Sequence, residues 1–239
     1  MSASAHEIWV YLAAKPLTWL TLTLVAYQAG LLLHIRFRRN PLVNPVLLAI
    51  AFLAGLLTIT DTGYHTFFEG AQFIHFLLGP ATVALAVPLY RQFALIRRSA
   101  VALMAALLTG SITAAGSAVG IAWALGGSPD LLVSLAPKSV TAPIAMAIVE
   151  DLGGLPTLTA VLVILTGITG AALGTGVLRL VRVGDHRAQG FALGLASHGI
   201  GTARAIQLSE TAAAFSGLAM GLNGLATAVL LPLIATLIL

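Results

Sequence analysis

The chain has 239 residues, of which 59% are hydrophobic and only 8% are charged, and its mean hydropathy is +1.00. Soluble domains carry about a quarter of charged residues, so this composition excludes a soluble globular protein and predicts an integral membrane protein. Cysteine is absent, which excludes disulfides and thiolate-bound metals, and the formal net charge of +4 comes from three arginine clusters that mark cytoplasmic loops, not a surface for nucleic acid.

A helix needs roughly 20 apolar residues to cross a bilayer. Candidate segments lie at residues 17–35, 42–60, 79–96, 100–125, 131–150, 155–178, 188–207 and 211–238. The piece at 64–76 alternates aromatic and polar residues, which is typical of an interfacial or re-entrant segment. We therefore predict an all-α polytopic membrane protein of about seven to eight transmembrane or re-entrant helices, in a single integral membrane domain over residues 1–239.

The arginine clusters predict the orientation of the chain, because short cytoplasmic loops are enriched in basic residues. They lie at residues 34–39, 91–98 and 179–187. With all three clusters inside, the first four segments cross in alternation, and residues 61–78 and 126–130 lie outside.

The same rule predicts that one later segment does not cross completely. If 131–150 and 155–178 both crossed, the arginines at 179–187 would lie outside. We favour 131–150 as the broken segment because Pro137 and Pro143 each remove a backbone donor. Broken backbone at membrane depth must be buried in protein or line a water-filled cavity, so a cavity is expected beside it.

A weak internal similarity relates residues 17–97 to residues 100–207, leaving a final helix at 211–238. In each half a proline-containing polar break precedes small aliphatic residues, and a helix rich in Gly, Ala, Ser and Thr follows. The charge rule makes 79–96 descend and 188–207 ascend, which is the relation between inverted repeats. Paired breaks of this kind predict discontinuous helices around a transporter site near the bilayer midplane.

Lys138 is the most informative charged residue, in the stretch "APKSVTAP". A lysine at the centre of a membrane helix costs roughly 2.5–3.5 kcal/mol, so something must offset that cost. If residues 137–143 are unwound, free backbone amides, the ammonium and the hydroxyls of Ser139 and Thr141 converge, which predicts an anion site. The alternative is a structural lysine that snorkels to the outer interface or pairs with an acid such as Glu150.

A second group of polar residues lies in "GLASHGIGTARA", residues 194–205. On a continuous helix Ser197 and Arg204 share one stripe with glycines, and His198 and Thr202 lie beside it four residues apart. These side chains supply donors for a carboxylate, and the imidazole can carry a proton. The alternatives are that the glycines serve helix packing and that Arg204 anchors a helix end at the outer interface.

Asn44 and Thr82 are the counterparts in the first half and are predicted to contribute an amide and a hydroxyl to the site. Either can equally mark a helix start, since Asn before an apolar run is a typical N-cap. The chain has no zinc-binding His pair, no nucleophile elbow and no phosphate-binding loop. We therefore predict no catalytic residue, no metal and no cofactor, and we do not expect an enzyme.

Five blocks in this order resemble the LrgB/CidB family of bacterial membrane proteins: "NPLVNPVLLAI", "GPATVALAVPLYRQ", "PKSVTAPIAM", "GLASHGIGTARA" and "ETAAAFSGLAMGLNGLATAVLLPLI". The resemblance implies a holin-like multi-pass protein of the bacterial cytoplasmic (inner) membrane, linked to control of murein hydrolases, autolysis and programmed cell death. It also implies a small LrgA/CidA-like membrane partner. The family block usually has a second threonine where this chain has Ala142, which puts one hydroxyl contact in doubt.

Two functions follow from the residues and the resemblance together. The first is a transporter or facilitator of small monocarboxylates of the pyruvate, glycolate or lactate type, working as a homodimer or higher homo-oligomer. Lys138 or Arg204 would hold the carboxylate, and His198 would couple a proton. Hydroxyls that would read the 2-hydroxy or 2-oxo group belong to Ser139, Thr141, Ser197 and Thr202. The alternative is a holin-like pore-forming or regulatory oligomer without a small-molecule site.

Overall fold

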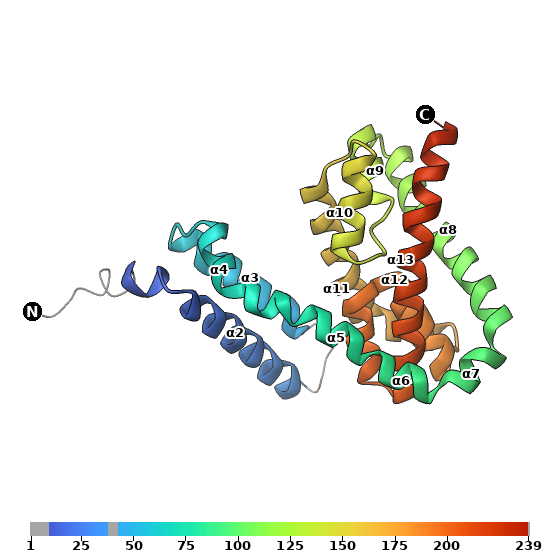
Figure 1. Ribbon diagram of the computed structural model, residues 1–239, viewed down its shortest axis with the longest axis horizontal. Coiled ribbons are helices and arrows are strands. Elements are labelled where there is room, and N and C mark those ends of the chain that lie inside the picture. The colour runs from blue at the N-terminus through green and yellow to red at the C-terminus, as the bar shows by residue number, and fades with distance from the viewer. Residues whose placement is uncertain (1–9, 38–42, 239) are drawn as a thin grey trace, which may run out of the picture. The chain divides into compact units, whose positions relative to one another are not determined.

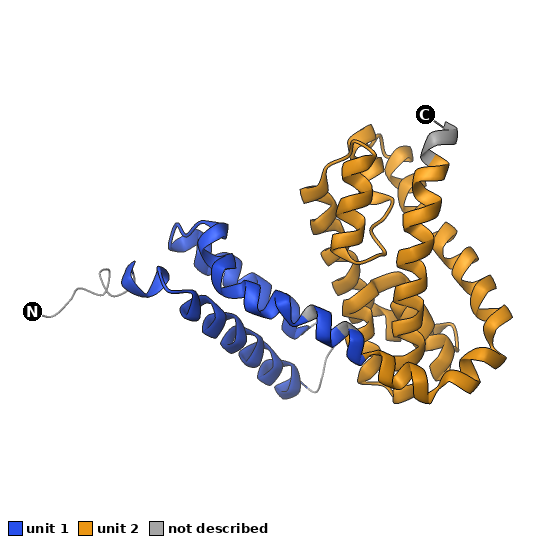
Figure 2. Ribbon diagram, in the orientation of Figure 1, with its two compact units in different colours: residues 1–84 blue, residues 85–239 orange. Residues whose placement is uncertain are grey.

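The computed structural model describes residues 10–37 and 43–238, and every regular element in them is a helix (Figure 1). Helices long and apolar enough to cross a membrane are Pro16–Arg36, the run Tyr64–Arg91, Ala100–Ala124, Pro156–Leu180 and Glu210–Ile234. The prediction of an all-α polytopic membrane protein is therefore confirmed. Contacts divide the chain into two compact units, residues 1–84 and 85–239 (Figure 2).

Unit 1 contains three helices packed around small residues and a fourth that follows them along the chain. They are α2 (Pro16–Arg36), α3 (Pro45–Ile59), α4 (Tyr64–Phe76) and α5 (Leu78–Ala84). A Cβ on Gly30 of α2 would lie 2.8 Å from the carbonyl oxygen of Pro45, so only glycine allows α2 and α3 to approach this closely. Trp19 of α2 is completely buried and stacks edge-on against Phe67 of α4.

Two expectations for the first half of the chain are corrected. The segment predicted at 42–60 is the uninterrupted helix α3, which is shorter than a full span; residue 42 itself lies outside the described residues. The predicted span at 79–96 is replaced by the apolar run Tyr64–Arg91, because the aromatic residues of α4 extend the hydrophobic stretch toward the N-terminus. Within and after that run lie α5, α6 (Ala86–Arg91) and α7 (Phe93–Arg98).

Unit 2 is built on three long helices, α8 (Ala100–Ala124), α11 (Pro156–Leu180) and α13 (Glu210–Ile238). Its largest buried cluster joins Leu103 and Leu107 of α8 to Phe215 of α13. Between the long helices lie α9 (Pro129–Leu135), α10 (Ala142–Asp151) and α12 (His186–Ile206), which form two interrupted segments (Figure 1).

The first hairpin, residues 129–151, consists of α9, the non-helical residues 136–141 and α10. Ser134 of α9 accepts a hydrogen bond from the backbone amide of Leu155 at 2.9 Å, just beyond the end of α10. Thr159 of α11 donates to the carbonyl oxygen of Ser134 at 3.1 Å. The segment therefore leaves the start of α11 and returns to it, as predicted for the broken segment 131–150.

The second hairpin, residues 186–206, is α12 itself, which is broken at His198. His198 has φ 43° and ψ −131°, a conformation that costs a residue with a side chain about 1–3 kcal/mol. Gly194 before the break packs against the backbone of Ser216, and Thr202 after the break lies 2.9 Å from the Ser216 hydroxyl. Because both halves meet the same residue of α13, the chain must double back at the break.

This second hairpin corrects the prediction that residues 188–207 ascend as a crossing helix. With both hairpins doubling back, α8 and α13 run in one direction and α11 in the other, which allows the arginines at 91–98 and 179–187 to share one side, as the charge rule predicts. Arg91 and Glu210 form an ion pair at 3.2 Å, so α13 starts on the side of the 91–98 arginine cluster. The two hairpins therefore start from opposite ends of the long helices.

Single cysteines at three loops test this topology, since the natural chain contains none. We expect a membrane-impermeant maleimide to label Leu125→Cys and Leu155→Cys from outside and Gly184→Cys only from the cytoplasmic face. Labelling is measured in whole cells and in inverted vesicles. If Leu125→Cys and Leu155→Cys react from opposite faces, the first hairpin crosses the membrane and the assigned fold is wrong.

Candidate functional site

The tip of the first hairpin is residues 136–141, and the tip of the second is the break at His198. Both tips contact the middle of α11. Val140 in the first tip is buried in one cluster with Val163 of α11. In the second tip, Nε2 of His198 lies 3.0 Å from the carbonyl oxygen of Val163, so the imidazole donates this hydrogen bond. Two glycines of α11 make room for the second tip: a Cβ on Gly167 would touch the His198 ring, and a Cβ on Gly170 would overlap the Ser197 hydroxyl.

A pocket of about 380 Å³ opens where the tips approach α11. It is lined by Lys138, Leu162, Leu165, Thr166, Thr169, Gly170, Ala196 and Ser197. One charged group and three hydroxyl-bearing side chains thus face a small space with two leucines on its wall. This pocket, which we call the Lys138 pocket, is the candidate functional site.

Two polar groups of the Lys138 pocket, the Ser197 hydroxyl and the Lys138 ammonium, have fewer partners in the structure than they can bind. Ser197 is 1% exposed, and its Oγ has no hydrogen-bond partner among the residues that the structure describes. The ammonium of Lys138 donates to the hydroxyl of Ser139 at 3.2 Å but forms no ion pair within residues 10–37 and 43–238, so the predicted alternative of pairing with a nearby acid is not seen. A buried polar group without a partner costs about 1–3 kcal/mol, so this arrangement favours an anionic ligand.

Other predicted residues lie close to the pocket without lining it. Ser139 is buried beside Lys138, and His198 follows Ser197 directly in the second tip. Thr141 precedes α10 as its N-cap but forms no side-chain capping hydrogen bond. Thr202 donates to the carbonyl oxygen of His198 at 2.9 Å, which stabilises the bend.

Three predicted residues remain: Arg204, which does not line this pocket, and Asn44 and Thr82, which belong to unit 1. Arg204 lies near the end of α12, where it donates to the side chain of Gln207 at 2.7 Å. Asn44 caps α3 by accepting from the amides of Val46 at 2.9 Å and Leu47 at 3.2 Å, which is the helix-start alternative. Thr82 belongs to α5, and its side chain lies outside the described part of the chain.

Sequence reasoning missed Asn223, which lies under both tips. Asn223 is 1% exposed in the middle of α13. Its Nδ2 donates to the carbonyl oxygens of Ser139 at 3.2 Å and Leu195 at 3.1 Å, and its Oδ1 accepts from Ser111 of α8 at 2.6 Å. A single amide inside an apolar helix was the available signal, because such residues are expensive in a membrane.

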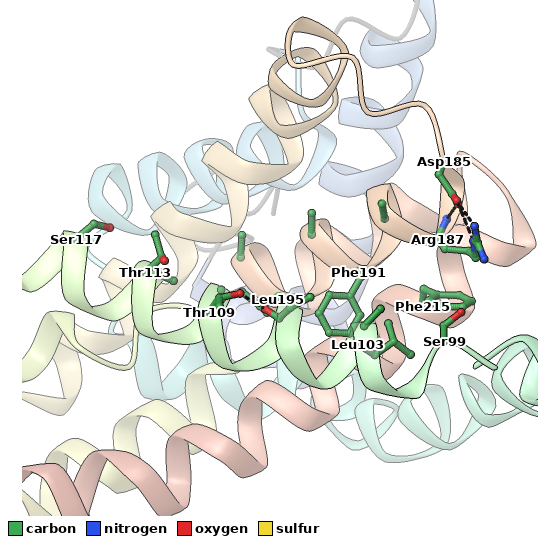
Figure 3. Close-up of a pocket in the computed structure, with 17 residues that line it drawn as sticks. Ser99, Leu103, Thr109, Thr113, Ser117, Asp185, Arg187, Phe191, Leu195 and Phe215 are labelled. Atoms are coloured by element: carbon green, nitrogen blue, oxygen red, sulfur yellow. Dashed lines mark hydrogen bonds and ion pairs between the residues drawn. The ribbon is translucent and has the colours of Figure 1, made fainter. Parts of the chain in front are cut away.

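A larger groove of about 670 Å³ runs between α8 and α12 (Figure 3). Small residues such as Ala106 and Gly110 line most of it, and Asp185 and Arg187 lie at one end. The pKa of the Asp185 carboxyl is lowered to about 2 because Arg187 donates hydrogen bonds to it. Since this arginine is already paired and the rest of the wall is mainly apolar, the groove is less suited to a small anion than the Lys138 pocket.

Unit 2 thus defines a class of polytopic membrane protein in which two interrupted helical hairpins bring a lysine and hydroxyls to the middle of a membrane-length helix. Residues 23–237 match the LrgB-like family, and the chain belongs to this family. It is 38% identical to the uncharacterized protein YxaC of Bacillus subtilis, over 84% of this chain and 87% of that protein.

Relatives from Staphylococcus carry a descriptive name. The chain is 33% identical to holin-like protein CidB of Staphylococcus aureus, over 93% of this chain and 97% of that protein. It is 32% identical to holin-like protein CidB of Staphylococcus epidermidis, over 90% of this chain and 94% of that protein. No solved structure matches the chain. The chain is therefore a multi-pass membrane protein of a bacterial holin-like family.

Two glycines of α11 form a matched pair for testing the packing of the second tip. We expect Gly170→Ala to lower the free energy of unfolding by about 1–3 kcal/mol, because the added Cβ overlaps the Ser197 side chain. Gly176→Ala meets nothing within 4 Å and should be neutral or stabilising by up to about 1 kcal/mol. Thermal unfolding of the detergent-solubilised proteins gives the comparison, and equal stability of both variants would contradict the packing described.

Proposed function

We propose that the protein is a transporter or facilitator of small monocarboxylates, of the pyruvate, glycolate or lactate type, in the bacterial cytoplasmic membrane. The observation that carries this proposal is the Lys138 pocket, where an ammonium and the Ser197 hydroxyl share one space, the first without an ion pair and the second without a hydrogen bond to any described residue. A single carboxylate supplies acceptors for both groups. It also neutralises a charge that is costly at this depth.

The chemistry of the pocket suits a small substrate with one charge. In the proposal Lys138 and Ser197 hold the carboxylate, as a charge-assisted and a neutral hydrogen bond. Thr166 and Thr169 line the same pocket and are placed to bind a 2-hydroxy or 2-oxo group, while Leu162 packs against the short carbon chain. Thr166 and Thr169 thus join the hydroxyls predicted from the sequence.

His198 is the group that we assign to proton coupling. It follows Ser197 in the chain, lies at the break of α12, and holds the second tip to α11 through Val163. Imidazole is the side chain that exchanges protons most readily near neutral pH. Because Nε2 donates to Val163, His198 would take up the added proton at Nδ1 while its contact with α11 is kept.

Alternating access follows from hairpins that enter from opposite faces, each closing one side of the pocket. This arrangement supports discontinuous helices and an inverted repeat, with the two breaks at residues 136–141 and at His198 instead of one in each half of the chain. The proposal retains a single integral membrane domain over residues 1–239, a homo-oligomeric state, an LrgA/CidA-like small membrane partner and a link to murein hydrolase control.

The second candidate function is a holin-like pore-forming or regulatory oligomer without a small-molecule site. The name of the Staphylococcus relatives favours it. The two functions differ in whether they require the positive charge of Lys138. A carrier needs its ammonium to bind substrate, whereas a pore tolerates a neutral residue there.

Uptake of labelled pyruvate, glycolate and lactate into proteoliposomes tests the proposal. We expect Lys138→Gln to lower saturable uptake about ten- to a hundredfold, because it removes a hydrogen bond to a charged ligand worth about 1.5–3 kcal/mol. The matched control is Lys15→Gln, which removes the chain's only other lysine, outside the pocket, and should leave uptake unchanged.

One result of the uptake experiment would contradict the carrier function. Non-selective release of an entrapped dye, at the same rate with Lys138→Gln as with the natural protein, contradicts the carrier and supports the holin-like alternative. The folded state of each variant is checked by size-exclusion chromatography before reconstitution.

A further inference from the structure

Asn223 bonds to both interrupted segments at once. The two hydrogens of its Nδ2 go to different hairpins, one to the carbonyl oxygen of Ser139 and one to that of Leu195. Its Oδ1 accepts from Ser111, which fixes the plane of the amide relative to α8. A side-chain amide has two donor hydrogens, so both are used, and both reach backbone atoms that a helix break leaves unpaired.

These bonds lie next to the two polar groups of the Lys138 pocket. Ser139 follows Lys138 directly and accepts a hydrogen bond from its ammonium at 3.2 Å. Leu195 lies two residues before Ser197, on the same side of the break at His198. Asn223 itself does not line the pocket, so its influence on a ligand passes through the backbone of the two tips.

We propose that Asn223 is the shared anchor of the two re-entrant tips, a positioning residue that holds Lys138 and Ser197 in one pocket and keeps both sides of the pathway closed. A tip that moves away from α13 leaves a buried donor and a buried carbonyl unpaired. Loss of the Nδ2 donors should therefore loosen both hairpins, although they enter from opposite faces. The inference deepens the proposed function, yet it concerns the tips and can be tested without any substrate.

The test uses the cysteine-free chain with reporters at the two tips. Val140→Cys in the first hairpin and Leu195→Cys in the second replace side chains that are 1% and 7% exposed. In an otherwise natural chain we expect slow labelling by membrane-impermeant maleimides at both reporters. With Asn223→Leu, which keeps roughly the size of the side chain and removes both donors without adding a charge, we expect labelling roughly tenfold faster, at Val140→Cys from outside and at Leu195→Cys from the cytoplasmic face. Tenfold corresponds to about 1.4 kcal/mol, close to the net value of one hydrogen bond.

Ser111→Ala is the matched control. It removes the hydrogen bond to Oδ1 of Asn223 and leaves both Nδ2 donors in place. Labelling at the two reporters should therefore stay near the rate measured with the natural Ser111. Asn223→Ser, which retains a single donor, is the second variant and should give a smaller increase. Chromatographic profile and thermal midpoint show whether each variant is folded.

Several results would overturn the inference. Faster labelling at only one tip, or at neither, shows that Asn223 does not anchor both hairpins. An equal increase with Ser111→Ala shows that general loosening of the helices is responsible. Failure of both Asn223 variants to fold, while Ser111→Ala folds, makes the residue a requirement of the fold and not an anchor of the tips. If Lys138→Gln loses carboxylate uptake while Asn223→Leu leaves labelling unchanged, the proposed function stands and the anchor inference fails.

Discussion

Backbone amides and carbonyls that lie inside a bilayer must find partners within the protein, because no water is available there. Unit 2 breaks its helices twice beside the middle of the membrane-length helix α11, at residues 136–141 and at His198, and each break interrupts the helical hydrogen bonding of the backbone. Asn223 satisfies a carbonyl from each break, and Thr202 satisfies that of His198. The rest of the structure depends on this constraint, since broken helices are tolerated only where such partners are placed.

Close packing of the second tip depends on glycines, which have no side chain, at the points where helices touch. Gly170 of α11 leaves the space that the Ser197 hydroxyl occupies, and Gly194 of α12 lies against the backbone of α13. Apolar side chains cannot drive helices together in lipid as they do in water, so small residues that allow close contact replace that driving force. The same closeness leaves the Ser197 hydroxyl buried without a hydrogen-bond partner among the described residues, and the proposed carboxylate would supply one.

Much of the candidate site was accessible from patterns in the chain. The sequence predicts a functional role for Lys138 because an ammonium inside a membrane is costly. Pro137 and Pro143 predict the break in the helix around it. The sequence also indicates Ser197, but it predicts that the residues around Ser197 form one continuous helix, whereas α12 is broken at His198. Arg204 therefore shared a stripe with Ser197 in the sequence and lies elsewhere in the fold. Asn223 was missed because a lone amide carries no spacing.

The sequence by itself determined that this is a membrane protein and to which family it belongs, and it predicted the cytoplasmic loops and a segment that does not cross. Each follows from quantities summed along the chain, namely hydropathy, arginine position and motif order. Only the tertiary structure decided that α12 also doubles back and that both tips meet beside α11. The physical reason is that a break at a histidine has no local signal comparable to proline. It persists because contacts with Val163, Ser216 and Asn223, all distant in the chain, hold it.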